Sequence, residues 1–140
     1  MKPNRTRSII FTIVTVLYIA AVAYLCFANF KKLPDLPKLF LGIPTDKVVH
    51  FCMFFPFPCL AFMAFDKHTD SLRSSAFWAV GTFLAGCVIA AATEWGQARL
   101  TTWRSGDGTD FIADLAALAV SSLLVFFIDI RKQRRACTKN

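Results

Sequence analysis

Four long runs of apolar residues, separated by short polar stretches, organise the chain. Each run contains at most one Asp, Glu, Lys, Arg or His residue, and the runs cover residues 9–30, 48–65, 75–98 and 111–128. A helix needs about 20 predominantly apolar residues to cross a bilayer, which is close to the length of every run. We therefore predict an all-α polytopic membrane protein, with four transmembrane helices forming a small bundle in one domain over residues 1–140. The connections are too short to be separate domains, and they cover residues 31–47, 66–74 and 99–110.

A cleavable secretory signal is the alternative interpretation of the first run. Basic residues precede the run, and Ala21-Val22-Ala23 has the small-residue form of a cleavage site. The run is longer than the apolar region of a signal peptide, which has about 7–15 residues. We therefore expect an uncleaved anchor, and cleavage after Ala23 would leave the orientation of the other helices unchanged.

Composition agrees with a membrane protein and excludes a disordered chain. Of the 140 residues, 56% are hydrophobic and 18% are charged, against about 45–50% and 25% in soluble domains. The net charge of +7 would suit nucleic acid, but the basic residues flank the apolar runs, where they anchor helices beside lipid headgroups. With both termini in the cytoplasm, ten of the sixteen Lys and Arg residues lie inside, as the positive-inside rule expects. We predict membrane lipids, and no nucleic acid, as partners.

The five cysteines do not indicate redox or zinc chemistry. Their number is odd, four lie inside the apolar runs and none forms a CxxC pair, so they do not describe a disulfide framework. A metal signature such as HExxH is also missing from the sequence. We assign no cofactor and no metal ligand from these patterns.

Two features of the apolar runs predict how the helices pack. Pro56 and Pro58 lie inside the second run and should kink its helix, because proline removes a backbone hydrogen bond. Small residues four apart permit close helix approach, and they occur at Gly86 and Ala90 in the third run and at Ala113, Ala117 and Ser121 in the fourth.

Polar residues within or beside the membrane gather at one end of the four runs. A charged side chain at the centre of a membrane helix costs about 2.5–3.5 kcal/mol on insertion scales, so such residues suggest a functional site. With the orientation above, this end faces the outer side, and we expect a polar pocket that binds a ligand there. Its predicted members are Asp46, Lys47, His50, Glu94, Gln97, Arg104, Asp107, Asp110 and Asp114.

Helical spacing supports this cluster. Residues three or four apart share a helix face, which pairs Asp46 and Lys47 with His50, Glu94 with Gln97, and Asp110 with Asp114. Arg104 can bind a carboxylate through two hydrogen bonds. The carboxylates together with His50 can surround a divalent cation.

Each of these residues also has a structural interpretation. Asp46 stands where a helix N-cap is wanted, so Asp46 and His50 could serve only as caps. Glu94 could reach the interface or pair with an arginine, and Asp107 belongs to a turn dipeptide. Asp114 lies a full turn inside an apolar run and favours a shared cluster, although polar contacts between helices also hold bundles together at roughly 0.6–2 kcal/mol each.

Three motifs in this order resemble the VanZ-like family of membrane proteins. The resemblance covers residues 46–121, and the motifs are Asp46-Lys47-Val48-Val49-His50-Phe51, Glu94-Trp95-Gly96-Gln97, and Arg104-Ser105-Gly106-Asp107 followed by Asp110. It implies a small helical protein of the bacterial cell (inner) membrane, with a link to low-level teicoplanin resistance through the family's name member. The family's polar pattern falls on the predicted pocket residues from Asp46 to Asp110.

The chain departs from the VanZ-like pattern at four positions. These are Phe54, where tyrosine is common, Asp114, where the family usually has asparagine, and Ala117 and Ser121, where it tends to have glycine. Asp114 adds a negative charge, so its site should bind cations or share protons more readily than the sites of relatives.

Two classes of function follow, with a third possibility. The leading hypothesis is a non-enzymatic envelope protein whose outward pocket binds a lipid headgroup or a lipid-linked cell-wall precursor, or docks a partner, and so contributes to glycopeptide resistance. The alternative is an intramembrane metal-assisted hydrolase or transferase on a lipid-linked phosphate, with His50 and the carboxylates as ligands or acid and base and Arg104 on phosphate. An ion-coupled carrier is the third, for which an oligomer would be needed.

Overall fold

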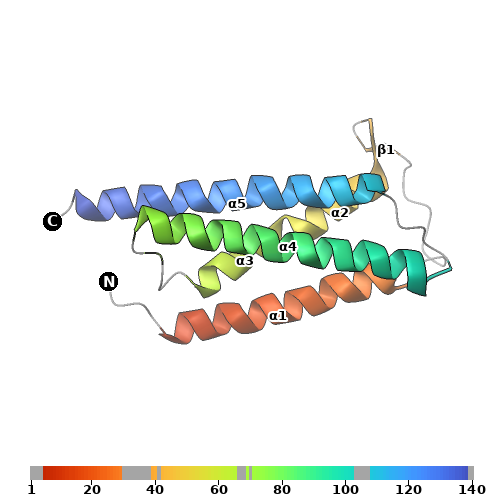
Figure 1. Ribbon diagram of the computed structural model, residues 1–140, viewed down its shortest axis with the longest axis horizontal. Coiled ribbons are helices and arrows are strands. Elements are labelled where there is room, and N and C mark those ends of the chain that lie inside the picture. The colour runs from red at the N-terminus through yellow and green to blue at the C-terminus, as the bar shows by residue number, and fades with distance from the viewer. Residues whose placement is uncertain are drawn as a thin grey trace.

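The structure, a computed structural model, describes residues 5–29, 39–40, 42–65, 69, 71–102 and 108–138. In chain order the elements are α1 (Arg5–Phe27), β1 (Leu39–Phe40), β2 (Ile43–Pro44), α2 (Thr45–Phe54), α3 (Pro56–Ala64), α4 (Leu72–Leu100) and α5 (Gly108–Cys137) (Figure 1). Within these ranges, four helical segments are long and apolar enough to cross a membrane: Arg5–Phe27, Thr45–Ala64, Leu72–Leu100 and Gly108–Ala136. The chain is therefore an all-α, multi-pass membrane protein, as the four apolar runs predict.

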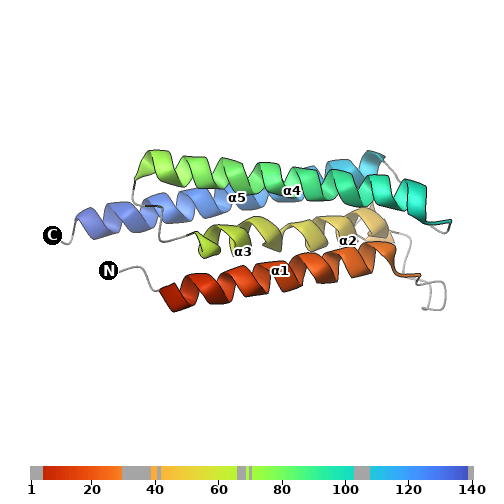
Figure 2. The ribbon, with the colours of Figure 1, turned by 60° about the horizontal axis from the view of Figure 1, so that its bottom comes forward.

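The helices lie side by side in one elongated bundle. α4 packs mainly against α5, α1 packs against α3, and α2 packs against α5. α2 and α3 follow one another in a line that runs between α1 and the α4–α5 pair (Figure 2). α1 begins and α5 ends at the same end of the bundle (Figure 1), which is the arrangement that an even number of crossings requires.

Large apolar side chains cover the outside of the bundle, and small residues allow close helix contacts in its interior. Phe77 is 68% exposed and Val88 is 69% exposed, as expected of side chains that face lipid. Ala90 and Ala117 are completely buried, and Gly86 is so close to α5 that an added Cβ would overlap the side chain of Leu118. The small-residue pattern therefore predicted the close contact between α4 and α5 correctly.

The second span is interrupted for one residue beside its prolines, where the sequence predicts a kink. α2 ends at Phe54 and α3 begins at Pro56, with Phe55 between them. Pro56 lacks the N–H that would continue the hydrogen-bond ladder. Beside the break, the Tyr18 hydroxyl of α1 donates a hydrogen bond of 2.7 Å to the carbonyl oxygen of Met53, so α1 supports the kinked span through a polar contact.

The start of α2 corrects one expectation. The helix begins at Thr45 with Pro44 at its N-cap position, and no side chain there caps it with a hydrogen bond. Asp46 is therefore in the first turn and is not the N-cap. Before the helix, β1 and β2 form a short antiparallel pair, with Gly42 at a positive φ of 81° in the connection, a conformation that glycine adopts without strain.

α4 and α5 are longer than the apolar runs that predict them. α4 starts at Leu72 because Ser71 and Ser74 form a reciprocal capping box. α5 continues past residue 128 to Cys137 and carries basic residues in its last turn, where they complement the helix dipole. A hydropathy pattern marks the part of a helix that suits lipid and does not mark the end of the helix.

Candidate functional site

His50 is the centre of a buried charged cluster at the end of the bundle where α2 and α5 begin (Figure 1). Its side chain lies one turn after Lys47 on α2 and is only 1% exposed. A histidine buried this deeply does not cap a helix at the headgroup level. The local cause is the position of α2, which packs against α5 and turns this face of its first turns toward the bundle interior.

The closest partner of the imidazole is Asp114 of α5. His50 Nδ1 lies 3.1 Å from Asp114 Oδ1 and 3.4 Å from Oδ2, so the N–H at this nitrogen donates to the carboxylate. The Asp114 side chain is fully buried. A buried charged group is tolerated when it is paired and hydrogen-bonded, and this contact supplies the partner that the membrane-depth aspartate requires.

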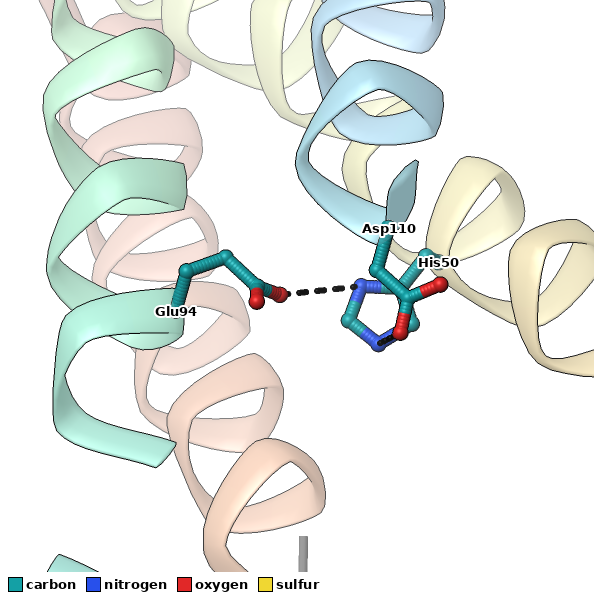
Figure 3. A group of neighbouring side chains, drawn as sticks. All are labelled: His50, Glu94 and Asp110. Atoms are coloured by element: carbon teal, nitrogen blue, oxygen red, sulfur yellow. Dashed lines mark ion pairs between the residues drawn. The ribbon is translucent and has the colours of Figure 1, made fainter. Parts of the chain in front are cut away.

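Two further carboxylates flank the same ring. Glu94 Oε1 of α4 lies 3.8 Å from His50 Nδ1, and Asp110 Oδ2 of α5 lies 3.8 Å from His50 Nε2. Figure 3 shows Glu94 and Asp110 reaching the imidazole from different helices. Both are mostly buried, at 12% and 13% exposed, so the ring is enclosed by acidic oxygens from two other spans.

Lys47 forms the edge of the cluster. Its Nζ lies 3.1 Å from Asp110 Oδ1 and 3.6 Å from Asp46 Oδ2, and the Asp46 side chain is 52% exposed. Helical spacing pairs Asp46 and Lys47 with His50, whereas the structure places the ammonium group between two carboxylates. Asp46 therefore lies at the rim of the cluster and Asp110 lies inside it.

Gln97 contacts α1 as well as belonging to the predicted set of pocket residues. The side chain is buried, and its Nε2 donates a hydrogen bond of 3.0 Å to the carbonyl oxygen of Cys26 near the end of α1. This bond ties α4 to α1. The predicted residues Arg104 and Asp107 lie outside the described residues.

A second buried carboxylate, Asp129, was missed by the sequence analysis. It lies near the opposite end of α5, is 5% exposed, and accepts hydrogen bonds from the Ser75 hydroxyl at 2.6 Å and from Gln133 Nε2 at 2.8 Å. Asp129 follows Leu118 by three helical turns, so both residues lie on one face of α5. This spacing was the signal in the sequence that Asp129 is buried. Asp129 itself stands just after the end of the apolar run and was therefore not considered part of the span.

The cluster has the composition of a cation site. His50, Glu94 and Asp110 each offer a ligand atom, and these three atoms all lie within 4.8 Å of one another. Carboxylate oxygens and an imidazole nitrogen are common ligands of divalent ions. The same groups can also accept hydrogen bonds from an ammonium or hydroxyl group of an organic ligand.

Comparison of the chain with family models, with curated proteins and with solved structures gave no match. The role of the cluster is therefore argued from its residues and their geometry.

Proposed function

We propose that the chain is a VanZ-like integral membrane protein of the bacterial cell envelope. In this proposal the cluster of Lys47, His50, Glu94, Asp110 and Asp114 binds the polar part of an envelope lipid or a lipid-linked cell-wall precursor. Both termini lie in the cytoplasm, so the cluster faces the outer side, where glycopeptides act on such precursors. Binding there lowers the susceptibility of the cell to teicoplanin.

One observation carries the proposal: three carboxylates from α4 and α5 converge on the buried imidazole of α2 at one end of the bundle. Burying this many charges is costly, and an uncharged close contact between Gly86 and Leu118 already joins α4 and α5. Lys47, Glu94 and Asp110 keep 25%, 12% and 13% of their side-chain surfaces exposed, so a headgroup at the membrane surface can reach them.

The proposed orientation follows from the positions of the basic residues. The end of α5 carries Arg134 and Arg135 in its last turn, and α1 begins at the same end of the bundle (Figure 1). Basic residues beside a membrane helix favour the cytoplasmic side. The buried cluster lies at the opposite end, which is the outer end in this orientation.

Isosteric variants in living cells test the proposal. We expect Glu94→Gln and Asp110→Asn to make cells as susceptible to teicoplanin as cells that lack the protein, because each removes one charge with almost no change in shape. Asp129→Asn is the matched control, since it neutralises a buried carboxylate at the other end of α5. Membrane levels of all variants are measured by immunoblot.

Two results would overturn the proposal. The first is unchanged teicoplanin susceptibility in cells carrying either cluster variant at normal membrane levels. The second is an equal loss of protection in the Asp129→Asn control, because protection would then depend on the bundle as a whole and not on this cluster.

A further inference from the structure

The two ring nitrogens of His50 differ in their hydrogen bonding. Nδ1 is hydrogen-bonded to Asp114 at 3.1 Å. Within the described part of the chain, Nε2 is buried and has no hydrogen-bond partner. Its nearest acidic oxygen, Asp110 Oδ2, lies 3.8 Å away, too far for a hydrogen bond. A buried nitrogen in this position carries a desolvation penalty unless something binds it.

The hydrogen bond to Asp114 prepares Nε2 for a metal ion. Histidine ligands typically donate the N–H of one ring nitrogen to a carboxylate, which fixes the tautomer and raises the basicity of the other nitrogen. Asp114 supplies that carboxylate here and is itself fully buried. The lone pair of Nε2 is then directed toward the side on which Asp110 lies.

The separations of the acidic oxygens fit one ion. Ligands bound to a small divalent ion at about 2.1 Å lie between about 3 Å and 4.2 Å from one another, depending on whether they are adjacent or opposite. The ligand atoms of His50, Glu94 and Asp110 lie within 4.8 Å of one another. Glu94 Oε1 lies 3.8 Å from Nδ1, so the Glu94 side chain must turn toward Nε2 to join His50 and Asp110 at one centre. Figure 3 shows the three side chains converging from α2, α4 and α5.

The charge balance of the cluster also favours a divalent ion. Glu94, Asp110 and Asp114 surround the ring, while Lys47 supplies an ammonium group 3.1 Å from Asp110 Oδ1. Among the described residues, these carboxylates outnumber the ammonium group beside them. Their negative charge attracts a divalent cation. Lys47 contacts Oδ1 of Asp110 and leaves Oδ2 facing the ring.

We propose that His50, Glu94 and Asp110 bind a divalent first-row transition-metal ion, with Asp114 as the positioning residue that orients His50. The mixed nitrogen and oxygen ligand set suits Mn²⁺, Fe²⁺ or Zn²⁺ better than Ca²⁺, which takes oxygen ligands. The biological role of the metal site rests on the proposed function. The contacts that would bind the ion do not depend on a role in teicoplanin resistance.

Mn²⁺ alone is the probe, because it prefers nitrogen and oxygen ligands over the free thiols of Cys52 and Cys59, which are exposed in the spans. The full chain, purified in detergent without a histidine tag, is titrated with Mn²⁺ while the electron paramagnetic resonance signal of the free ion is recorded. We expect one bound Mn²⁺ per chain and spin-echo modulation from an imidazole nitrogen.

Variants identify the ligands. Glu94→Gln and Asp110→Asn should each weaken Mn²⁺ binding at least tenfold, and Asp114→Asn should weaken it by about 10–100-fold, the usual effect of removing a partner of a ligating histidine. Asp129→Asn should bind like the unmodified chain. Circular dichroism confirms that each variant retains its helices.

The proposal is wrong if the folded chain binds no Mn²⁺ at millimolar concentration, or if Glu94→Gln and Asp110→Asn bind it as tightly as the unmodified chain. Nitrogen modulation missing from a bound ion would exclude His50 as a ligand. Loss of teicoplanin protection in Glu94→Gln cells, without metal binding by the purified chain, would refute the metal site and leave the proposed function standing. Metal binding by the purified chain, with unchanged teicoplanin protection in Glu94→Gln cells, would support the metal site and refute the proposed function.

Discussion

Packing at Gly86 holds α4 and α5 at the separation that the charged cluster needs. A Cβ added at Gly86 would overlap Leu118 Cδ2 and would lie 3.2 Å from Phe57 Cδ1. Leu118 is one turn after Asp114 on α5 and is completely buried, so its side chain has little room to move away. We predict that Gly86→Ala destabilises the bundle and disturbs the contact between His50 and Asp114.

The magnitude follows from two opposing effects. Replacing glycine by alanine inside a helix stabilises it by about 0.5–1 kcal/mol, while forcing an extra methyl group into a well-packed core costs about 1–3 kcal/mol. Gly81 lies on the same helix, and a Cβ there meets nothing within 4 Å. Gly81→Ala should therefore stabilise α4, and the difference in unfolding free energy between the two alanine variants should be about 1–3 kcal/mol.

The assay is reversible unfolding in mixed micelles, with sodium dodecyl sulfate as the denaturant and helical circular dichroism as the signal. Adding Leu118→Ala to Gly86→Ala removes the overlapping side chain, so the double variant should lose less stability than the sum of the two single changes. A Gly86→Ala chain as stable as Gly81→Ala would refute the packing argument. Additive behaviour of the double variant would contradict the assigned contact with Leu118.

Two other predictions use the same unfolding assay. Tyr18→Phe removes the hydroxyl that donates to the Met53 carbonyl oxygen. It should cost about 0.6 kcal/mol and at most about 1.7 kcal/mol, the average and the maximum measured for polar contacts between membrane helices. An unchanged midpoint would mean that the second span does not need this contact. Asp129→Leu removes a buried acceptor from Ser75 and should cost about 1–3 kcal/mol, whereas Asp129→Asn keeps an acceptor oxygen and should lose clearly less stability. Equal losses of stability in the two variants would show that Asp129 does not stabilise the bundle through this hydrogen bond.

The four spans and the kink could be predicted because each depends on local properties of the chain. Uncharged length determines whether a segment suits lipid, and Pro56 breaks the hydrogen-bond ladder wherever the helix packs. The ends of α5 could not be predicted in this way. A helix can continue through charged residues beyond the membrane, so the apolar run was shorter than α5.

The site could be predicted in part. Spacing along one helix identified Glu94, Asp110 and Asp114 as residues near a shared end, and the structure brings them around His50. Contacts between helices depend on the rotation of each helix in the bundle, which a single sequence does not contain. For that reason the hydrogen bond from Gln97 to a backbone carbonyl of α1 could not be predicted from spacing along α4.

The partners of α5 have a consequence for how the protein is made. Asp114 bonds to a histidine 64 residues earlier in the chain, and Asp129 bonds to a serine 54 residues earlier. Because chains are synthesised from the N-terminus, His50 and Ser75 are made before either carboxylate exists. Both early side chains can be uncharged, which makes them the less expensive halves of each pair to hold in lipid. Asp114 and Asp129 are therefore synthesised after His50 and Ser75, so neither of these two carboxylates enters the membrane before its partner has been made.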